Sequence, residues 1–133
     1  MLNPFPQLLM FGFFVPTLIR TTVAAVFVYL ALTHFKTKKD VAHSLPFKSN
    51  EVAVWAVGIA ILIELGIAGT LFFGAYTQIA ALLAALGSIK ALALKRRFPA
   101  LYPLAGLAYA LLAVMAISII FTGAGAFAFD LPL

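Results

Sequence analysis

Two ionisable side chains stand alone inside long apolar stretches of the sequence. Arg20 is the only charged residue between Met1 and Phe35, and Glu64 is the only one between Val52 and Ile89. A charged group at membrane depth costs about 2.5–3.5 kcal/mol on insertion scales, so such groups are usually paired and functional. Counted from the basic ends of their predicted helices, both lie roughly 20 Å deep. We therefore predict that Arg20 and Glu64 form an ion pair or a hydrogen-bonded polar site.

The chemistry of such a site suits a lipophilic ligand that carries polar groups. An arginine supplies the hydrogen-bond donors that a quinone carbonyl needs, and a protonatable carboxylate beside it exchanges protons during reduction. Two structural interpretations of the same residues stay open. In one, Arg20 and Glu64 form a pair that only fixes the helix register. In the other, Arg20 extends to the surface while Glu64 remains protonated.

Further polar candidates share helix faces with these two residues. At 3.6 residues per turn, Arg20 shares a stripe with a candidate gate histidine: Arg20, Ala24, Phe27, Ala31 and His34. A later helix carries the comparable stripe Gln78, Ala81, Ala85 and Ser88. The stripes predict a narrow polar lining with Gln78 and Ser88 as ligand contacts, although a packing seam of small residues has the same pattern. We expect His34 and His43 to be solvated at the basic boundary.

Three glycines lie on roughly the opposite side of the predicted helix from Glu64. Gly58, Gly66 and Gly69 allow another helix backbone to approach closely. The pattern predicts contact with a partner subunit, such as a second copy of the chain, or packing against a neighbouring helix of the same chain.

The elements that position these residues follow from a composition too apolar for a water-soluble domain. Of the 133 residues, 65% are hydrophobic and 10% are charged, with a mean hydropathy of +1.13, whereas soluble domains average about 25% charged residues. Alanine and leucine, both good helix formers, dominate the apolar stretches, and polar–apolar alternation is lacking. The sequence predicts an all-α transmembrane four-helix bundle as a single domain. Its spans are expected at 16–35, 51–73, 76–94 and 100–121, with residues 1–15 as an interfacial segment or a helix extension.

Basic residues at the helix ends predict the orientation in the membrane. The connections 36–50 and 95–99 carry Lys36, Lys38, Lys39, Lys48, Lys95, Arg96 and Arg97, whereas the opposite end has no basic residue outside a span. The positive-inside rule places both connections in the cytoplasm and both termini outside, in a bacterial or archaeal cytoplasmic membrane. The net charge of +5 reflects lysines that face an anionic leaflet, and no nucleic-acid partner is expected. The absence of cysteine excludes disulfides and thiolate metal sites.

The order and spacing of these features resemble the DoxX family of small four-helix membrane proteins. The shared features are an arginine early in the first span, a basic helix end, the segment Glu64–Thr70 with spaced glycines, and the closing segment Gly123–Asp130. The sequence departs from the family late in the third span, where it has Ser88 and Lys90, and at Tyr102, where many members have an acidic residue. The resemblance implies a membrane subunit, since relatives are linked to quinone-dependent sulfur oxidation, terminal oxidases and oxidative-stress complexes.

We therefore hypothesise a DoxX-like accessory subunit of a membrane redox or oxidative-stress complex, with redox partner subunits and a quinone or other lipophilic ligand at Arg20 and Glu64. No haem, flavin, iron–sulfur or metal motif is evident, so electrons must come from a partner, and no catalytic residue is predicted. Two alternatives are a small proton-coupled transporter that uses Glu64 and a ligand-free membrane scaffold. The glycines of the C-terminal tail permit a turn that brings Asp130 to the surface near Arg20.

Overall fold

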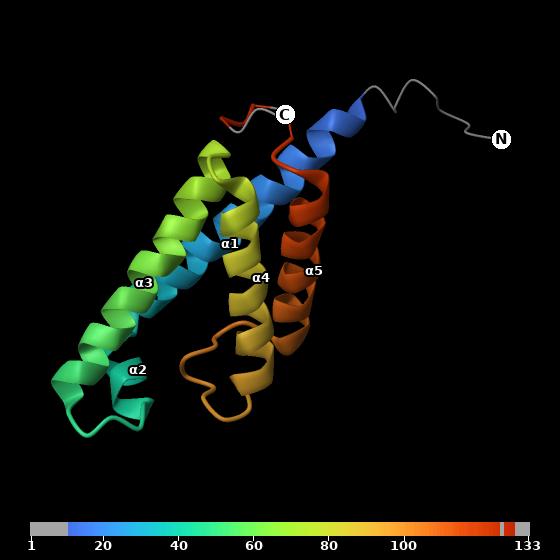
Figure 1. Ribbon diagram of the computed structural model, residues 1–133. Coiled ribbons are helices and arrows are strands. Elements are labelled where there is room, and N and C mark those ends of the chain that lie inside the picture. The colour runs from blue at the N-terminus through green and yellow to red at the C-terminus, as the bar shows by residue number, and fades with distance from the viewer. Residues whose placement is uncertain (1–10, 126, 130–133) are drawn as a thin grey trace.

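The computed structural model describes residues 11–125 and 127–129, and in this part of the chain every regular element is helical (Figure 1). The helices follow one another as α1 (Val15–Lys36), α2 (Lys38–Ser44), α3 (Asn50–Phe73), α4 (Thr77–Leu94) and α5 (Gly106–Thr122). The predicted all-α fold class is confirmed. A short 3₁₀ turn at 11–14 leads directly into α1, so the described part of the N-terminal segment extends the first helix.

Three of the helices are long and apolar enough to cross a membrane. The first, α1 with its leading turn, has 26 residues, α3 has 24 and α4 has 18, whereas α5 is apolar but has 17. At 1.5 Å per residue these lengths correspond to about 26–39 Å, against about 30 Å of bilayer hydrocarbon. Large apolar side chains such as Leu62, Phe72 and Phe121 are exposed on the outside of the bundle. Such an apolar exterior is compatible with contact with lipid.

The helix ends follow local chemistry. Pro16 lies in the first turn of α1, where its missing N–H leaves no hydrogen bond unmade, and α3 ends at Gly74 with a φ of 70°. The first three predicted spans agree with α1, α3 and α4 to within one residue at each end. The predicted start of the fourth span at residue 100 is wrong. Helix α5 begins at Gly106, and Pro103 disfavours a helix that runs through Tyr102 from residue 100.

The connection after α1 contains a helix that the sequence analysis did not predict. Helix α2 places Val41 and Ala42 against Ala53 and Val57 of α3, and these residues form a small second core. Because α2 packs along α3, the first turns of α3 extend beyond the end of α1 (Figure 1). The ends of α1 and α3 are therefore at different levels.

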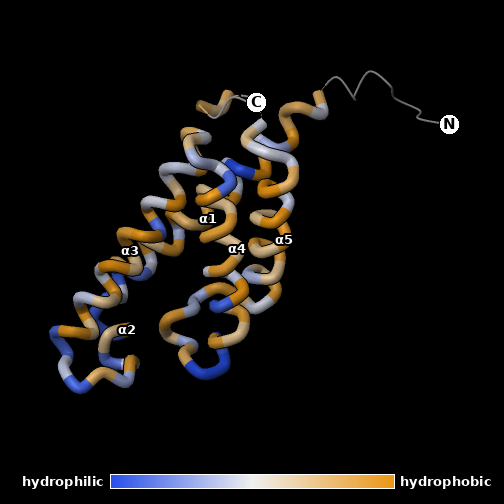
Figure 2. The backbone as a smooth tube through the Cα atoms, viewed as in Figure 1, coloured by the Kyte–Doolittle hydropathy of each residue, from blue (hydrophilic) through white to orange (hydrophobic). Residues whose placement is uncertain are grey.

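The long helices form two antiparallel pairs, α1 with α3 and α4 with α5, which share one core. The pairs meet at the end that holds the α3–α4 turn and separate towards the opposite end (Figure 1). Hydrophilic residues gather at that opposite end, in α2 and in the loop 95–105 (Figure 2). We call the two ends the turn end and the basic end. The start of α1 and the end of α5 both lie at the turn end (Figure 1).

Candidate functional site

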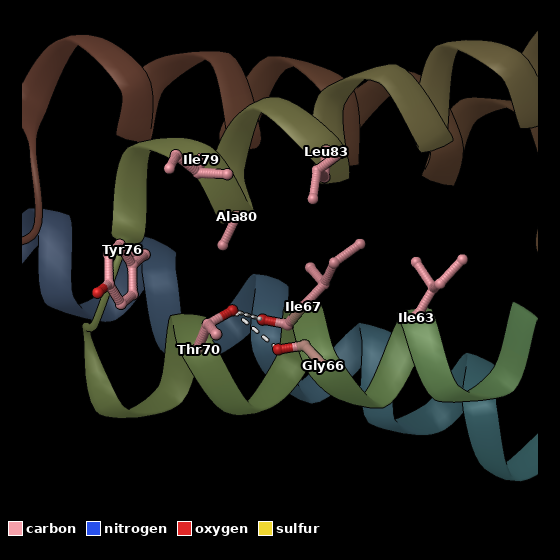
Figure 3. Close-up of a pocket in the computed structure, with 8 residues that line it drawn as sticks. All are labelled: Ile63, Gly66, Ile67, Thr70, Tyr76, Ile79, Ala80 and Leu83. Carbon is pink, nitrogen blue, oxygen red and sulfur yellow. Dashed lines mark hydrogen bonds between the residues drawn. The ribbon is translucent and has the colours of Figure 1, made fainter. Parts of the chain in front are cut away.

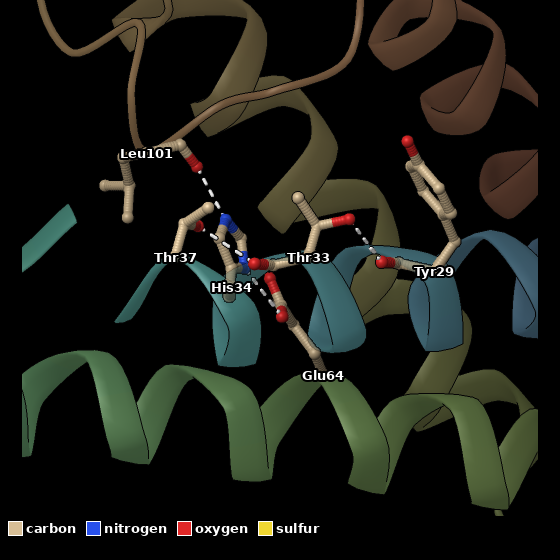
Figure 4. A network of polar contacts seen from close by, with 6 residues as sticks. All are labelled: Tyr29, Thr33, His34, Thr37, Glu64 and Leu101. Carbon is tan, nitrogen blue, oxygen red and sulfur yellow. Dashed lines mark hydrogen bonds and ion pairs between the residues drawn. The ribbon is translucent and has the colours of Figure 1, made fainter. Parts of the chain in front are cut away.

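A buried histidine and a carboxyl group form the central polar contact of the molecule. His34, near the end of α1, is 5% exposed, and its Nδ1 lies 2.9 Å from Oε2 of Glu64 on α3 (Figure 4). The Nε2 atom lies 2.8 Å from the carbonyl oxygen of Leu101, in the loop before α5. The pair therefore joins α1, α3 and the α4–α5 loop at one point.

The protonation of this pair follows from its hydrogen bonds. The Leu101 carbonyl can only accept, so Nε2 of His34 must carry a proton. Nδ1 then either accepts a hydrogen bond from protonated Glu64 or, in the imidazolium, donates one to the carboxylate. Both arrangements share one proton and have no net charge. Loss of that proton would leave two lone pairs facing each other at 2.9 Å, so the geometry of the pair fits one shared proton.

Lys95 and two tyrosines complete the surroundings of the α4–α5 loop. The Lys95 ammonium donates to the Leu104 carbonyl and lies 5.9 Å from the centre of the Tyr109 ring. Tyr102 packs edge-on against Tyr109 with 6.1 Å between the ring centres. Burial raises the pKa of the Tyr102 hydroxyl, which keeps this loop residue uncharged at physiological pH. Lys95 and His34 thus both hold the loop by donating hydrogen bonds to its backbone carbonyls.

The predicted pair of Arg20 and Glu64 is not formed. Glu64 binds His34, and no ion pair within 4.0 Å joins Glu64 to Arg20, both of which are described. Glu64 lies about 21 Å from the start of α3, whereas His34 lies only about 3 Å from the end of α1. Helix α3 therefore extends about 18 Å beyond the end of α1 at the basic end. Two residues that are the same number of positions from the basic ends of α1 and α3 thus do not lie at the same depth. The prediction that His34 is solvated is also wrong, whereas His43 is exposed as expected.

Arg20 lies at the turn end, where it holds the C-terminal tail. Its side chain is 1% exposed, with Nη1 3.0 Å from the Ala124 carbonyl oxygen and Nη2 3.4 Å from that of Phe127. A Cβ atom at Gly74 would overlap Nη1 of Arg20 and come within 2.7 Å of the Ala128 Cβ. The positive φ and the lack of a side chain at Gly74 are thus both needed for this contact.

The tail is held at two further points. Gly125, with a φ of 71°, lies so close to α1 that a Cβ atom there would be 2.8 Å from Cβ of Pro16. The Phe129 amide donates to the Phe73 carbonyl at 3.4 Å. Among the described residues of the tail, backbone carbonyls bind Arg20. Asp130, the predicted tail contact, lies outside the described residues.

The predicted polar stripe on α4 is a packing seam. Ala81 and Ala85 are buried in the shared core, and the buried hydroxyl of Ser88 donates to the Ala84 carbonyl of its own helix at 2.8 Å. Gln78 is exposed. The interpretation of these residues as ligand contacts in a polar lining is not supported by these positions. By contrast, the predicted stripe on α1, from Arg20 to His34, is buried as one face.

Of the three α3 glycines, Gly58 packs against another helix of the described chain, whereas Gly66 and Gly69 do not. A Cβ atom at Gly66 or Gly69 would meet no atom within 4 Å, whereas Gly58 is covered by the Lys38 side chain. Gly66 lines an apolar groove of about 280 Å³ between α3 and α4 (Figure 3), with the lining residues Ile63, Gly66, Ile67, Thr70, Tyr76, Ile79, Ala80 and Leu83. The Thr70 hydroxyl bonds back to the Gly66 and Ile67 carbonyls, so the groove offers no side-chain donor from this threonine. Contact of these glycines with a partner subunit stays a prediction.

Comparison with known proteins gives no relative. No family model, no curated protein and no solved structure matches the chain. Among the described residues no group of three histidine or acidic side chains is placed to hold a metal ion.

Proposed function

We propose that the chain is an integral membrane protein of four spans, of the kind that the DoxX resemblance implies. Three helices with membrane-spanning length, the shorter apolar α5 and the lipid-like outer surface support this architecture. In the proposed orientation the basic end lies in the cytoplasm and the turn end lies outside, in the cytoplasmic membrane of a bacterium or archaeon.

The absence of cysteine makes this orientation testable with single introduced cysteines. Ser49→Cys and Ala100→Cys at the basic end are expected to react with a membrane-impermeant maleimide only after cells are permeabilised. Thr122→Cys at the turn end is expected to react in intact cells. All three positions are exposed. Labelling of Ser49→Cys and Thr122→Cys from the same side would contradict the four-span architecture.

We propose further that this membrane protein binds and releases a proton as an accessory subunit of a redox or oxidative-stress complex. The observation that carries the proposal is the part-buried His34–Glu64 contact, whose geometry fits one proton shared between two helices. Reduction of a quinone or of oxygen consumes protons, so a complex of this kind uses a subunit that supplies them. A quinone site made jointly by Arg20 and Glu64 is no longer part of the proposal, because the two side chains have different partners.

The second candidate is the ligand-free scaffold. It is favoured by Arg20, whose guanidinium closes the turn end by binding tail carbonyls. In a scaffold the His34–Glu64 contact serves only packing and keeps its proton at every physiological pH. The two candidates therefore differ in whether the pair titrates.

Titration of the ring nitrogens of the two histidines distinguishes these candidates. In nanodiscs that contain ¹⁵N-histidine-labelled protein, we expect the His34 resonances to change with pH separately from those of exposed His43. Glu64→Gln replaces the carboxyl by an amide that can donate to Nδ1 but cannot exchange a proton, so the coupled change should disappear. His43→Gln assigns the signals and should leave the His34 titration unchanged. A His34 spectrum that is constant with pH in the wild type would favour the scaffold.

A further inference from the structure

The basic end concentrates positive charge that the protein itself does not neutralise. Every lysine and arginine except Arg20 lies there, namely Lys36, Lys38, Lys39, Lys48, Lys90, Lys95, Arg96 and Arg97, with only Asp40 and Glu51 as acidic residues near them. In the described part of the chain the one ion pair is His34–Glu64. None of these cations therefore has a carboxylate within 4.0 Å among the described residues.

The Lys38 ammonium lies against the surface of the neighbouring helix α3. It is half-buried, and its Nζ lies 3.2 Å from the position that a Cβ atom at Gly58 would occupy. The ammonium thus lies against α3 at Gly58, where a methyl group on residue 58 would force it to shift by a few tenths of an ångström. No carboxylate or carbonyl of the described residues accepts a hydrogen bond from it. An ammonium has three donors, and a half-buried one needs acceptors close by.

The position of the Lys38 ammonium along the neighbouring helix α3 indicates which hydrogen-bond acceptors surround it. Gly58 lies about 12 Å from the start of α3, one turn beyond Trp55, which is 75% exposed. An exposed tryptophan near a helix end is typical of the membrane–water interface. Given the proposed membrane insertion, the Lys38 ammonium lies at the depth of the lipid headgroups, where phosphate oxygens are the abundant acceptors.

We propose that Lys38, seated on Gly58, binds the phosphate of an anionic phospholipid. The Nζ donors bind the phosphate oxygens, and the excess of cations around Lys38 favours a headgroup with net negative charge over a zwitterionic one. Apolar α3 side chains that face outward, such as Ile59 and Leu62, offer a surface for the acyl chains. The site is separate from the His34–Glu64 pair, and a failure of either proposal leaves the other in place.

Native mass spectrometry of the purified chain tests the site by counting retained lipids. Nanodiscs of equal parts phosphatidylglycerol and phosphatidylcholine provide the lipid, and we expect the released protein to retain phosphatidylglycerol preferentially. Lys38→Gln should lower this preference about fivefold, the factor that corresponds to about 1 kcal/mol for one basic residue near an anionic surface. The matched control Lys39→Gln removes an exposed ammonium from the same helix and should have a smaller effect, because water and salt screen it.

Two further experiments distinguish lipid binding at Lys38 from general attraction to the positive charge of the surface. Gly58→Ala keeps every charge but places a methyl group against Nζ, so it should lower the preference in the same direction as Lys38→Gln. Excess inorganic phosphate should leave the lipid bound, since it lacks acyl chains. Equal losses from Lys38→Gln and Lys39→Gln, equal retention of the two lipids by the wild type, or displacement by inorganic phosphate would each overturn the proposal.

Discussion

Replacing Arg20 by methionine is expected to lower the free energy of unfolding by about 3–5 kcal/mol and to detach the C-terminal tail. Methionine has a similar length but no donors, so the Ala124 and Phe127 carbonyls lose the guanidinium that holds them. Each hydrogen bond to a charged group contributes about 1.5–3 kcal/mol, which sets the size of the effect. Thermal unfolding in detergent measures the stability, and limited proteolysis after Phe127 or Phe129 measures the release of the tail.

The control for this prediction is Thr22→Val on the same helix. The Thr22 hydroxyl is exposed and bonds only to the Leu18 carbonyl of its own helix, so its loss should change stability by less than about 0.5 kcal/mol. An Arg20→Met protein with the melting temperature and the protease resistance of the wild type would show that the tail is held by its apolar contacts alone. The role of Arg20 at the turn end would then be wrong.

The second large effect is expected for the His34–Glu64 contact, measured as a double-mutant cycle. His34→Leu and Glu64→Leu each leave one buried polar group without its partner, and each should cost about 1–3 kcal/mol. His34→Leu should cost more than Glu64→Leu, because it also removes the hydrogen bond to the Leu101 carbonyl. The double variant should lose less than the sum of the two, by a coupling of about 0.6–1.7 kcal/mol.

Chemical denaturation of the four proteins in mixed micelles gives the free energies for this cycle. His43→Leu serves as the control, since His43 is exposed and should show no coupling to Glu64. Strictly additive effects of His34→Leu and Glu64→Leu would contradict a direct contact. They would also remove the basis for a shared proton.

Much of the architecture was predictable because lipid imposes a simple requirement on the sequence. Helices long and apolar enough to cross a membrane carry few charges, so the gaps between charged clusters located α1 and the combined stretch of α3 and α4. The turn residues 74–78 divided that stretch, and all three helices agree with their predicted bounds to within one residue. The start of α5 was missed because residues 100–105 are as apolar as a helix but contain Pro103. Apolar composition alone does not distinguish a loop that packs on a bundle from the first turn of a span.

The polar site was predicted in part, since both Arg20 and Glu64 proved to be in polar contacts but with other partners. The missing information was the offset of α3 against α1, which depends on α2. Val41 and Ala42 stand as an apolar pair within a polar connection, and this is the signal that could have predicted a packed helix there. With α3 shifted along α1 by this offset, His34 is the α1 residue that lies at the same height as Glu64.

The two carbonyls that accept from Arg20, those of Ala124 and Phe127, could not have been predicted from residue types, because every residue has a backbone carbonyl. The glycines were the available clue. Gly74 and Gly125 have positive φ and stand where a side chain would collide with Arg20 and with Pro16 respectively. Glycines in a tail and in a tight turn indicate a close approach of backbones, but they do not say which charged group lies between them.

The contacts of Arg20 also have a consequence for the order in which parts of the chain can pack. Its two carbonyl acceptors lie 104 and 107 residues later in the sequence. At synthesis rates of about 5–20 residues per second, the ribosome needs about 5–20 s to make the intervening chain. Throughout that interval the first helix lacks these acceptors, and its contact with the tail forms only after residues 124–127 have been made. The packing of α1 at the turn end is therefore secured late, by a segment that the ribosome makes long after α1 itself.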